Sequence, residues 1–126
     1  MAKTVITSPS LPRLPFLSPG TRAGDYVFVS GQVGAQDDQG KTLTGIEAQT
    51  KQVLELVKRV LETTGASLND VVKATVFLTN AEDFAAMNKV YSTYFPKDPP
   101  ARSTIIVKAL AKPEYIVEIE CIAYRP

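Results

Sequence analysis

Hydrophobic and polar positions alternate over several stretches of the chain, and a period of two predicts β-strands. The alternation is strictest over residues 115–124, while β-branched and aromatic residues predict further strands at 4–7, 25–30 and 71–78. An apolar run at 105–107 predicts a buried strand. Within 71–78, alternation assigns to one face Val72, Ala74, Val76 and Leu78. Within 115–124, the expected apolar face carries Val117, Ile119, Cys121 and Ala123.

A second period, of three to four residues, predicts an amphipathic helix whose apolar stripe runs from Ile46 to Leu61. Thr44 and Glu47 have the spacing of a capping box, in which two side chains satisfy the first free amides of a helix. This motif predicts where the helix begins. Gly65 predicts where it ends, because glycine readily adopts the left-handed conformation that closes many helices.

A second helix is predicted from Asn80, as its cap, to about Phe95, where Pro96 ends it. Its apolar stripe contains one polar residue, Asn88. Asn88 either satisfies a buried backbone group or borders a pocket. The other members of the stripe are Phe84, Met87, Tyr91, Tyr94 and Phe95.

Prolines divide the N-terminal part of the chain and exclude a regular helix or a central strand between residues 8 and 20. This segment is expected to cross the surface as an extended coil that apolar side chains hold against the body. The prolines are Pro9, Pro12, Pro15 and Pro19. The expected anchors are Leu11, Leu14, Phe16 and Leu17.

These elements predict one α+β domain over residues 1–126, with the order β-β-β-α-β-α-β-β. Two helices, each about 10 Å wide, cover about one face of a sheet of five or six strands. The other face still carries apolar side chains, and a second copy of the chain is the economical cover for it. We therefore expect an obligate homo-oligomer with pockets between subunits.

The amino-acid composition excludes several classes of catalytic mechanism and of binding partner. The chain has no histidine, which excludes histidine-based triads, histidine-ligated zinc and imidazole acid–base catalysis. The lone Cys121 is expected to be a small buried hydrophobe in a reducing compartment. A net charge of +1 with scattered basic residues argues against nucleic acid as a partner. There is no signal peptide and no apolar run near the ~20 residues of a membrane span, so a cytoplasmic protein without membrane association is expected.

Arg102 is the first candidate for a functional site. It follows the prolines at 99–100, which favour extended backbone, and it stands before the apolar run at 105–107. A guanidinium fixed at the start of a strand can bind a carboxylate or a phosphate. The alternative is an ordinary edge arginine that is solvated or paired with Asp98.

Glu118 and Glu120 are the second candidate. Two residues apart on a strand, they share a face with alpha carbons ~6.5–7 Å apart. Such glutamates usually form the wet face of a sheet. Isoleucines flank them on that face, which indicates partial burial, and burial raises the pKa of a carboxyl group towards values useful in acid–base catalysis. Without other ligands in the sequence, no metal site is expected.

Several motifs, which together cover nearly the whole chain, resemble the RidA/YjgF family of reactive-intermediate deaminases, also called the L-PSP endoribonuclease family. The resemblance implies a chorismate-mutase-like fold with a six-stranded mixed sheet and two helices on one face. It also implies a homotrimer whose sheets form a central barrel with three clefts between subunits. The motifs are Val29-Ser30-Gly31-Gln32, residues 70–78, Asp83-Phe84 with Asn88 and Tyr91, Pro100-Ala101-Arg102-Ser103, and Val117-Glu118-Ile119-Glu120 with Ile122-Ala123.

The family's activity is the hydrolysis of 2-imino and enamine acids, such as 2-iminobutanoate and 2-iminopropanoate, to 2-oxo acids and ammonia without a cofactor. Carried over to this sequence, the resemblance implies that Arg102 binds the substrate carboxylate and that Glu118 positions the attacking water. The backbone around Ser30 and Gly31 would contact the substrate, and Asn88 would line the same cleft.

The chain departs from the family pattern at two positions that are expected to line the substrate site. Phe16 stands where these deaminases often carry a tyrosine, and Thr104 stands where they often carry a cysteine. Both changes leave the substrate range open, and the first weakens the expected positioning of water. Arg102 and Glu118 are unaffected.

Three alternatives therefore remain beside the small imino acid. One is deamination of a larger, aminomuconate-type enamine. The second is a small-acid-binding trimer without turnover. The third is a ribonuclease or translation inhibitor, as described for members of the family; the absence of histidine and of a basic stripe argues against it.

Overall fold

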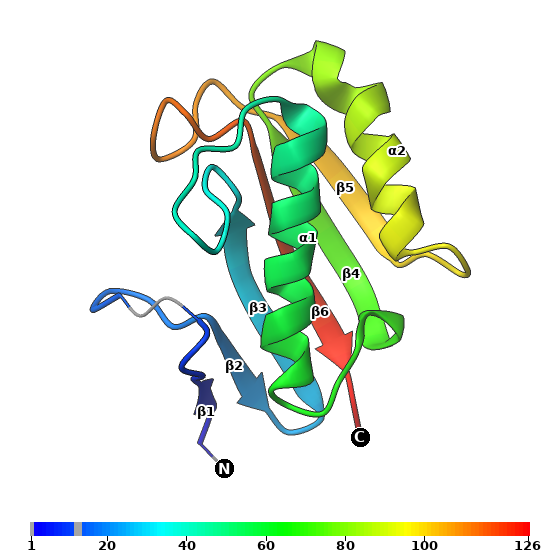
Figure 1. The fold of residues 1–126 in the computed structure, drawn as a ribbon. Coiled ribbons are helices and arrows are strands. Elements are labelled where there is room, and N and C mark those ends of the chain that lie inside the picture. Colours follow the sequence, from blue (N-terminus) through cyan, green and yellow to red (C-terminus); the bar gives the residue numbers. More distant parts are fainter. Residues whose placement is uncertain (1, 12–13) are drawn as a thin grey trace.

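Over residues 2–11 and 14–126, which the computed structural model describes, the chain forms six strands, two α-helices and two short 3₁₀ helices (Figure 1). The elements are β1 (Thr4–Ile6), β2 (Gly20–Ala23), β3 (Tyr26–Val33), α1 (Ile46–Glu62), η1 (Leu68–Asp70), β4 (Val71–Leu78), η2 (Ala81–Asp83), α2 (Phe84–Tyr94), β5 (Ala101–Ile106) and β6 (Val117–Tyr124). The predicted order of strands and α-helices is confirmed. The sequence pattern did not locate β2.

The strands form one mixed sheet in the order β1-β2-β3-β6-β4-β5. The pairs along it are antiparallel except β4 and β5. These two run parallel because α2 returns the chain to the end of the sheet at which β4 begins. β6, the last strand in sequence, lies between β3 and β4. β5 therefore forms one edge of the sheet, and β1 forms the other.

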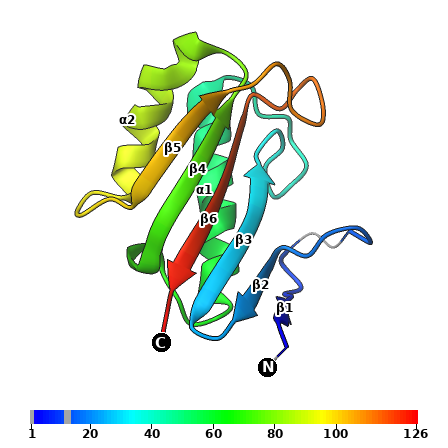
Figure 2. The same cartoon turned by 180° about the vertical axis from the view of Figure 1, so that it is seen from behind.

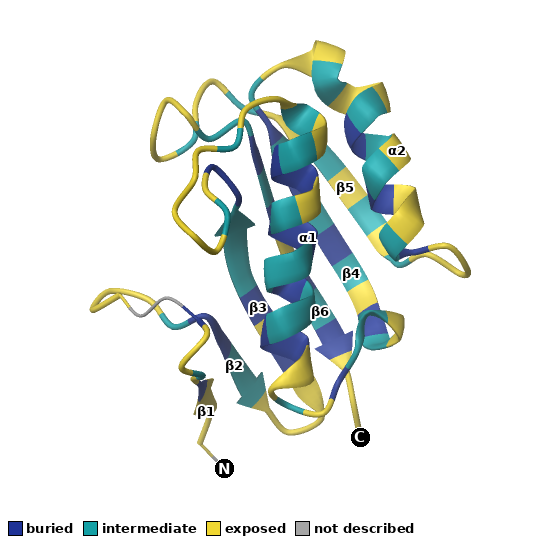
Figure 3. Ribbon diagram, in the orientation of Figure 1, coloured by how far each residue is buried: buried dark blue, intermediate teal, exposed yellow. Residues whose placement is uncertain are grey.

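Both α-helices cover the same face of this sheet, and Figure 2 shows the opposite face without a helix. The helix sides that face the sheet are buried (Figure 3), as burial of an amphipathic stripe requires. Each large apolar side chain buried there contributes about 1.5–3 kcal/mol. Fully buried members of this core include Val27, Val53, Leu54, Val57, Val60, Leu61, Val76, Leu78, Met87, Val117, Ile119 and Ala123.

The apolar face predicted for β6 is confirmed, and it includes the buried Cys121. The face predicted for β4 is partly wrong. Val71 is buried and Val72 is 46% exposed. The reason is a β-bulge between Val71 and Lys73, which inserts one residue and reverses the alternation at the start of the strand. From Ala74 onward the predicted alternation holds.

The capping box predicted at Thr44 and Glu47 is wrong. The N-cap of α1 is Gly45, which has a φ of 88° and makes no side-chain capping hydrogen bond. A left-handed φ favours glycine, so the backbone itself sets this helix start. The predicted end is confirmed by Gly65 (φ 84°), where the Ala66 amide donates to the Leu61 carbonyl over 3.2 Å. Asn80 does act as a cap, but for η2: it accepts a 2.9 Å hydrogen bond from the Glu82 amide.

The proline-rich segment is held against the body less than expected. Leu11 is buried, as predicted, whereas the anchor prediction is wrong for Phe16, which is 77% exposed, and for two exposed neighbours. An antiparallel bridge between Leu14 and Leu17 turns the chain outward and places Phe16 in the connecting turn. The prediction at Pro12 lies outside the described residues.

The strand that follows Arg102 is not buried in the single chain, contrary to prediction. Ile105 is 44% and Ile106 is 48% exposed, because β5 is an edge strand with a neighbour on one side. The face without helices is nevertheless apolar, as expected. Its exposed large hydrophobic residues include Val5, Tyr26, Phe28, Ile105 and Tyr124.

Candidate functional site

β5 places Arg102 on the helix-covered side of the sheet. Asp98 takes a left-handed conformation (φ 49°) before the two prolines, and β5 begins at Ala101. Arg102 pairs in register with the buried Ala74, and Thr104 pairs with the buried Val76. Paired residues of parallel strands share a face, so Arg102 and Thr104 point towards α2 at the open edge of the sheet.

Two aromatic rings of α2 hold the guanidinium. Its central carbon lies 4.7 Å from the centre of the Tyr91 ring and 5.8 Å from that of Phe84. Such cation–π contacts contribute about 0.5–2 kcal/mol. Among the described residues, the ion pairs join Arg59 with Asp38, Lys89 with Glu47, and Arg125 with Asp70, so the pairing of Arg102 with Asp98 is not observed.

Asn88 lies on the same face of α2 as these rings, because positions 84, 88 and 91 are four and three residues apart. Its Oδ1 atom is buried and has no hydrogen-bond partner among the described residues. The simple alternative, that Asn88 satisfies a buried backbone donor through this atom, therefore has no support. An acceptor left open on the helix face that carries these rings is what a polar pocket wall provides.

Tyr91 lies at the candidate site, although the sequence analysis named it only in the apolar stripe and in a family motif and gave it no role in the site. It was predicted as part of the apolar stripe, and it is 5% exposed, but its hydroxyl is buried without a partner. Burial raises the pKa of this phenol, and the positive charge of Arg102 opposes the rise. The available signal was its spacing, three residues after Asn88.

Glu118 lies on the other face of the sheet. In β6 it pairs with Phe77 on one side and Val33 on the other, and its neighbours in the strand, Val117 and Ile119, point into the core. Partial burial raises the pKa of the Glu118 carboxyl group, and the nearby charge of Glu120 raises it further. The predicted partial burial of this face is confirmed at Glu118 and wrong at Glu120, whose side chain is exposed.

Gly31 and Ser30 lie where β3 bulges against β6. The register shifts between Val29 and Gln32, and a β-carbon at Gly31 would overlap the carboxyl group of Glu118. Only a glycine admits so close an approach. The Ser30 hydroxyl donates a 2.6 Å hydrogen bond to the Ser18 carbonyl. These contacts bring Gly31 and Glu118 together and tie the bulge to the proline-rich segment.

Phe16 borders a cavity of about 790 Å³ on the face without helices. Ser30 and Glu120 line the same cavity, so Phe16 belongs with the Glu118 side of the sheet. Thr104 instead shares a face with Arg102. The two positions at which the chain departs from the family pattern therefore lie in different parts of one protomer.

A single chain does not bring Arg102 and Glu118 together. Arg102 is in register with Ala74, which pairs with Cys121, three residues from Glu118 along β6. The two positions are thus about 10 Å apart along the strands and two strand spacings, about 10 Å, apart across the sheet. Their side chains also point to opposite faces. A site that uses both must take them from different chains.

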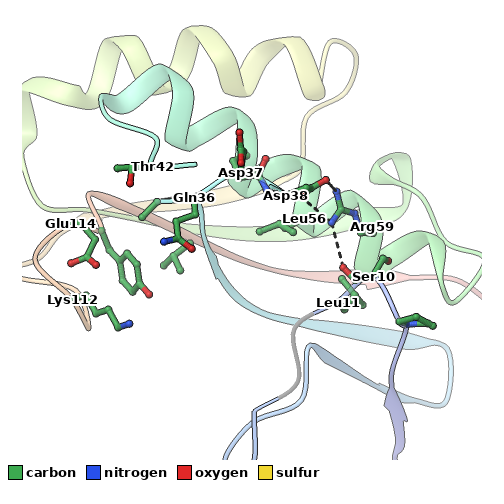
Figure 4. A pocket seen from close by; sticks show the side chains of 15 residues that line it. Ser10, Leu11, Gln36, Asp37, Asp38, Thr42, Leu56, Arg59, Lys112 and Glu114 are labelled. Carbon is green, nitrogen blue, oxygen red and sulfur yellow. Dashed lines mark hydrogen bonds and ion pairs between the residues drawn. The ribbon is translucent and has the colours of Figure 1, made fainter. Parts of the chain in front are cut away.

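A larger cavity, about 940 Å³, lies elsewhere, between α1 and the loops that follow β3 and β5 (Figure 4). On its wall Arg59 donates to the neighbouring Asp38 over 3.0 Å and lowers the pKa of that carboxyl group. The residues lining it include none of the predicted site residues. Within the described part of the chain, acidic residues and cysteine nowhere gather into a group of three that could hold a metal, and no helix is long and apolar enough to cross a membrane.

The mixed sheet with two helices on one face and an unpaired arginine at its edge defines a chorismate-mutase-like α+β protein with a candidate anion site. Residues 9–125 match the family model described as Endoribonuclease L-PSP. A RutC family protein of Pyrococcus abyssi is 44% identical over 127 residues, which cover 99% of each chain. The chain belongs to this RidA/YjgF/L-PSP family.

Solved structures agree with this assignment. RidA from an Antarctic Psychrobacter species is 37% identical and superposes with a TM-score of 0.88 over 96% of this chain and 98% of that one. TdcF of Escherichia coli, solved with bound serine, is 34% identical and has a TM-score of 0.89, with 98% and 99% of the two chains covered.

Proposed function

We propose that this protein hydrolyses small 2-imino and enamine acids to 2-oxo acids and ammonia. Arg102 binds the substrate carboxylate, and Glu118 of a neighbouring chain positions and activates the attacking water. Ser30, Gly31, Asn88, Phe16 and Thr104 line the cleft. The reaction requires no cofactor in this scheme, because the carbon of an imine is already electrophilic.

The unpaired guanidinium of Arg102 carries this proposal. Tyr91 and Phe84 hold it through their ring faces. A ring face does not use the N–H donors at the edge of the guanidinium, and none of the ion pairs among the described residues involves Arg102. Those donors can therefore form two parallel hydrogen bonds with a carboxylate. In an arginine with a purely structural role, the guanidinium N–H groups would be expected to form hydrogen bonds with protein acceptors.

Glu118 is suited to positioning and activating the attacking water. Its raised pKa makes its carboxylate a stronger base than an ordinary surface glutamate. The water oxygen forms a bond to the imine carbon as the π pair of the carbon–nitrogen bond moves to nitrogen, and the proton that Glu118 takes from the water is returned to that nitrogen. In the resulting carbinolamine the hydroxyl proton passes through Glu118 to the amino nitrogen, the carbon–nitrogen bond breaks, ammonia leaves with the electron pair and the 2-oxo group forms. An enamine first accepts a proton on carbon to give the imine.

The separation of Arg102 and Glu118 supports a cleft between chains. A homotrimer with the helix-free faces inward would bury the exposed apolar residues there, among them Phe28 and Ile105. The edge position of β5 leaves Arg102 at the border of a protomer, where a neighbour can reach it. Both features make an assembled site economical.

The relatives favour a small polar ligand. The Escherichia coli structure is described with bound serine, a small molecule that carries a carboxylate. RNA cleavage, which the description of the family model names, has less support, since a chain with a net charge of +1 and no histidine offers neither a basic surface nor an imidazole pair.

The buried thiol of Cys121 fits a reducing compartment, and we place the activity in the cytoplasm.

A coupled assay tests the proposal. A pyridoxal-phosphate dehydratase supplies the imino acid, and ammonia release is followed with and without this protein. Arg102→Ala should reduce the acceleration at least a hundredfold, whereas Arg59→Ala, which removes a cation from the unrelated cavity, should keep it. A wild-type rate in Arg102→Ala would show that the carboxylate is not bound by this residue.

Binding without turnover is the second candidate, because Phe16 removes a hydroxyl that the family often carries. Calorimetric titration with 2-oxobutyrate beside the ammonia assay separates the two. Affinity that depends on Arg102, in a protein that never accelerates ammonia release, would favour the acid-binding function.

A further inference from the structure

Tyr91 and Phe84 do not hold Arg102 equally. Phe84 is 44% exposed and 5.8 Å from the guanidinium carbon, while Tyr91 is 5% exposed and 4.7 Å away. Cation–π attraction strengthens as water is removed, so the Tyr91 ring is the firmer support. That ring is itself fixed, since its centre lies 4.7 Å from the ring centre of Phe95 in the core.

The hydroxyl hydrogen of Tyr91 has no acceptor within the described part of the chain. The group is buried and makes no hydrogen bond that meets the usual geometry. The Arg102 side chain lies near enough to lower the pKa of the phenol, but a guanidinium can only donate to the hydroxyl oxygen and leaves its hydrogen free. Burial raises the pKa of this phenol, so the group is a protonated donor at neutral pH. Buried polar groups normally have partners, and an exception asks for an explanation such as an absent ligand.

A second unpartnered atom lies on the same helix face. Oδ1 of Asn88, three residues before Tyr91, is a buried acceptor without a donor. The site thus offers free guanidinium donors, one free hydroxyl donor and one free acceptor. A carboxylate complements the first two, and an N–H group on the adjacent carbon complements the third.

We propose that Tyr91 is a ligand-binding residue of the anion site, whose ring positions the Arg102 guanidinium and whose hydroxyl donates a hydrogen bond to the bound carboxylate. This inference rests on the function proposed above for the choice of ligand. It adds a second donor to the carboxylate site, from α2 rather than from β5.

The test compares Tyr91→Phe, which removes the hydroxyl and keeps the ring, with Tyr91→Leu, which removes both. Binding of 2-oxobutyrate is measured by calorimetry, ammonia release by the coupled assay, and stability by thermal unfolding. Tyr94→Phe is the matched control, because Tyr94 lies on the same helix but donates to Glu55 over 2.7 Å.

We expect Tyr91→Phe to bind 2-oxobutyrate about tenfold more weakly, the effect of losing one hydrogen bond to a charged group. Its melting temperature should stay the same or rise, since a buried unpartnered hydroxyl is gone. Tyr91→Leu should bind more weakly still, and Tyr94→Phe should bind like the wild type.

Wild-type affinity in Tyr91→Phe would overturn the inference while leaving the deaminase proposal intact. Failure of the wild-type protein to bind 2-oxobutyrate would overturn it as well. Conversely, weaker binding by Tyr91→Phe in a protein that shows no turnover would support the role of Tyr91 and refute the deaminase proposal. A lower melting temperature with unchanged affinity would assign Tyr91 a purely structural role.

Discussion

Gly31 lies so close to Glu118 that a β-carbon at position 31 would overlap the glutamate's carboxyl group. The bulge in β3 creates this approach, and it leaves the carboxyl group no room on that side. The orientation of Glu118 therefore depends on the absence of a side chain at its neighbour.

Gly31→Ala tests this dependence. The overlapping atoms belong to the end of a flexible side chain, so we expect Glu118 to move while the backbone stays in place. A displacement of about 1 Å can cost about a hundredfold in rate, and we expect a fall of that order in kcat/KM with little change in melting temperature. Unchanged kcat/KM would mean that Glu118 does not act from the observed position.

Glu120→Gln should shift the pH profile of kcat/KM. Burial, and after it the charge of Glu120, raises the pKa of Glu118. Because the base must be deprotonated, activity falls as the pH drops through this pKa. Removal of the Glu120 charge lowers the pKa, so the acid limb should move to lower pH. If the acid limb does not move, a group other than Glu118 is responsible for it. Glu118→Gln should abolish the acid limb together with most of the activity.

Ile105→Asp should dissociate the assembly. The side chain is 44% exposed on the helix-free face in the single chain, and a charge there would have to be buried on association. Sedimentation should show smaller species at micromolar concentration. Ala85→Asp, on the exposed part of α2, is the control and should sediment like the wild type. Equal sedimentation of both variants would place the contact between chains elsewhere.

Thr50→Val should stabilise the fold. The Thr50 side chain is fully buried on α1, and its hydroxyl has no partner among the described residues. Valine has a similar shape without the unpaired group, so the free energy of unfolding should rise by about 1 kcal/mol. Urea denaturation measures the change. A loss of stability would mean that the hydroxyl is hydrogen-bonded, for example to a buried water.

The alternation of apolar and polar residues was sufficient to predict those elements in which the alternation itself decides which side chains are buried. The alternation from Val117 to Ala123 was enough to place β6, because one of its faces packs under α1. The same reasoning failed at Ile105, whose exposure depends on β5 lying at the sheet edge. Strand order is set by contacts distant in sequence. The bulge at Val72 likewise depends on pairing with β6.

The candidate site was predicted residue by residue but not in its arrangement. Arg102 and Glu118 were named as candidates, and Gly31 was expected to contact the substrate, but its close approach to Glu118 was not predicted. The face of the sheet that Arg102 takes follows from the register of β5 with β4, which the sequence alone does not specify. The role of Tyr91 was hidden because a tyrosine on an apolar stripe has the same pattern whether or not its hydroxyl is paired.

The opposite orientation of Arg102 and Glu118 has a consequence for mixtures of chains. When one site takes the arginine from one chain and the glutamate from the next, Arg102→Ala and Glu118→Gln chains are each inactive alone but complement one another. After random mixing in equal amounts, about a quarter of the clefts contain both intact groups. Activity that returns on mixing would show that each cleft takes its arginine from one chain and its glutamate from another. Dilution that separates the chains would then abolish activity without any change in the individual chain.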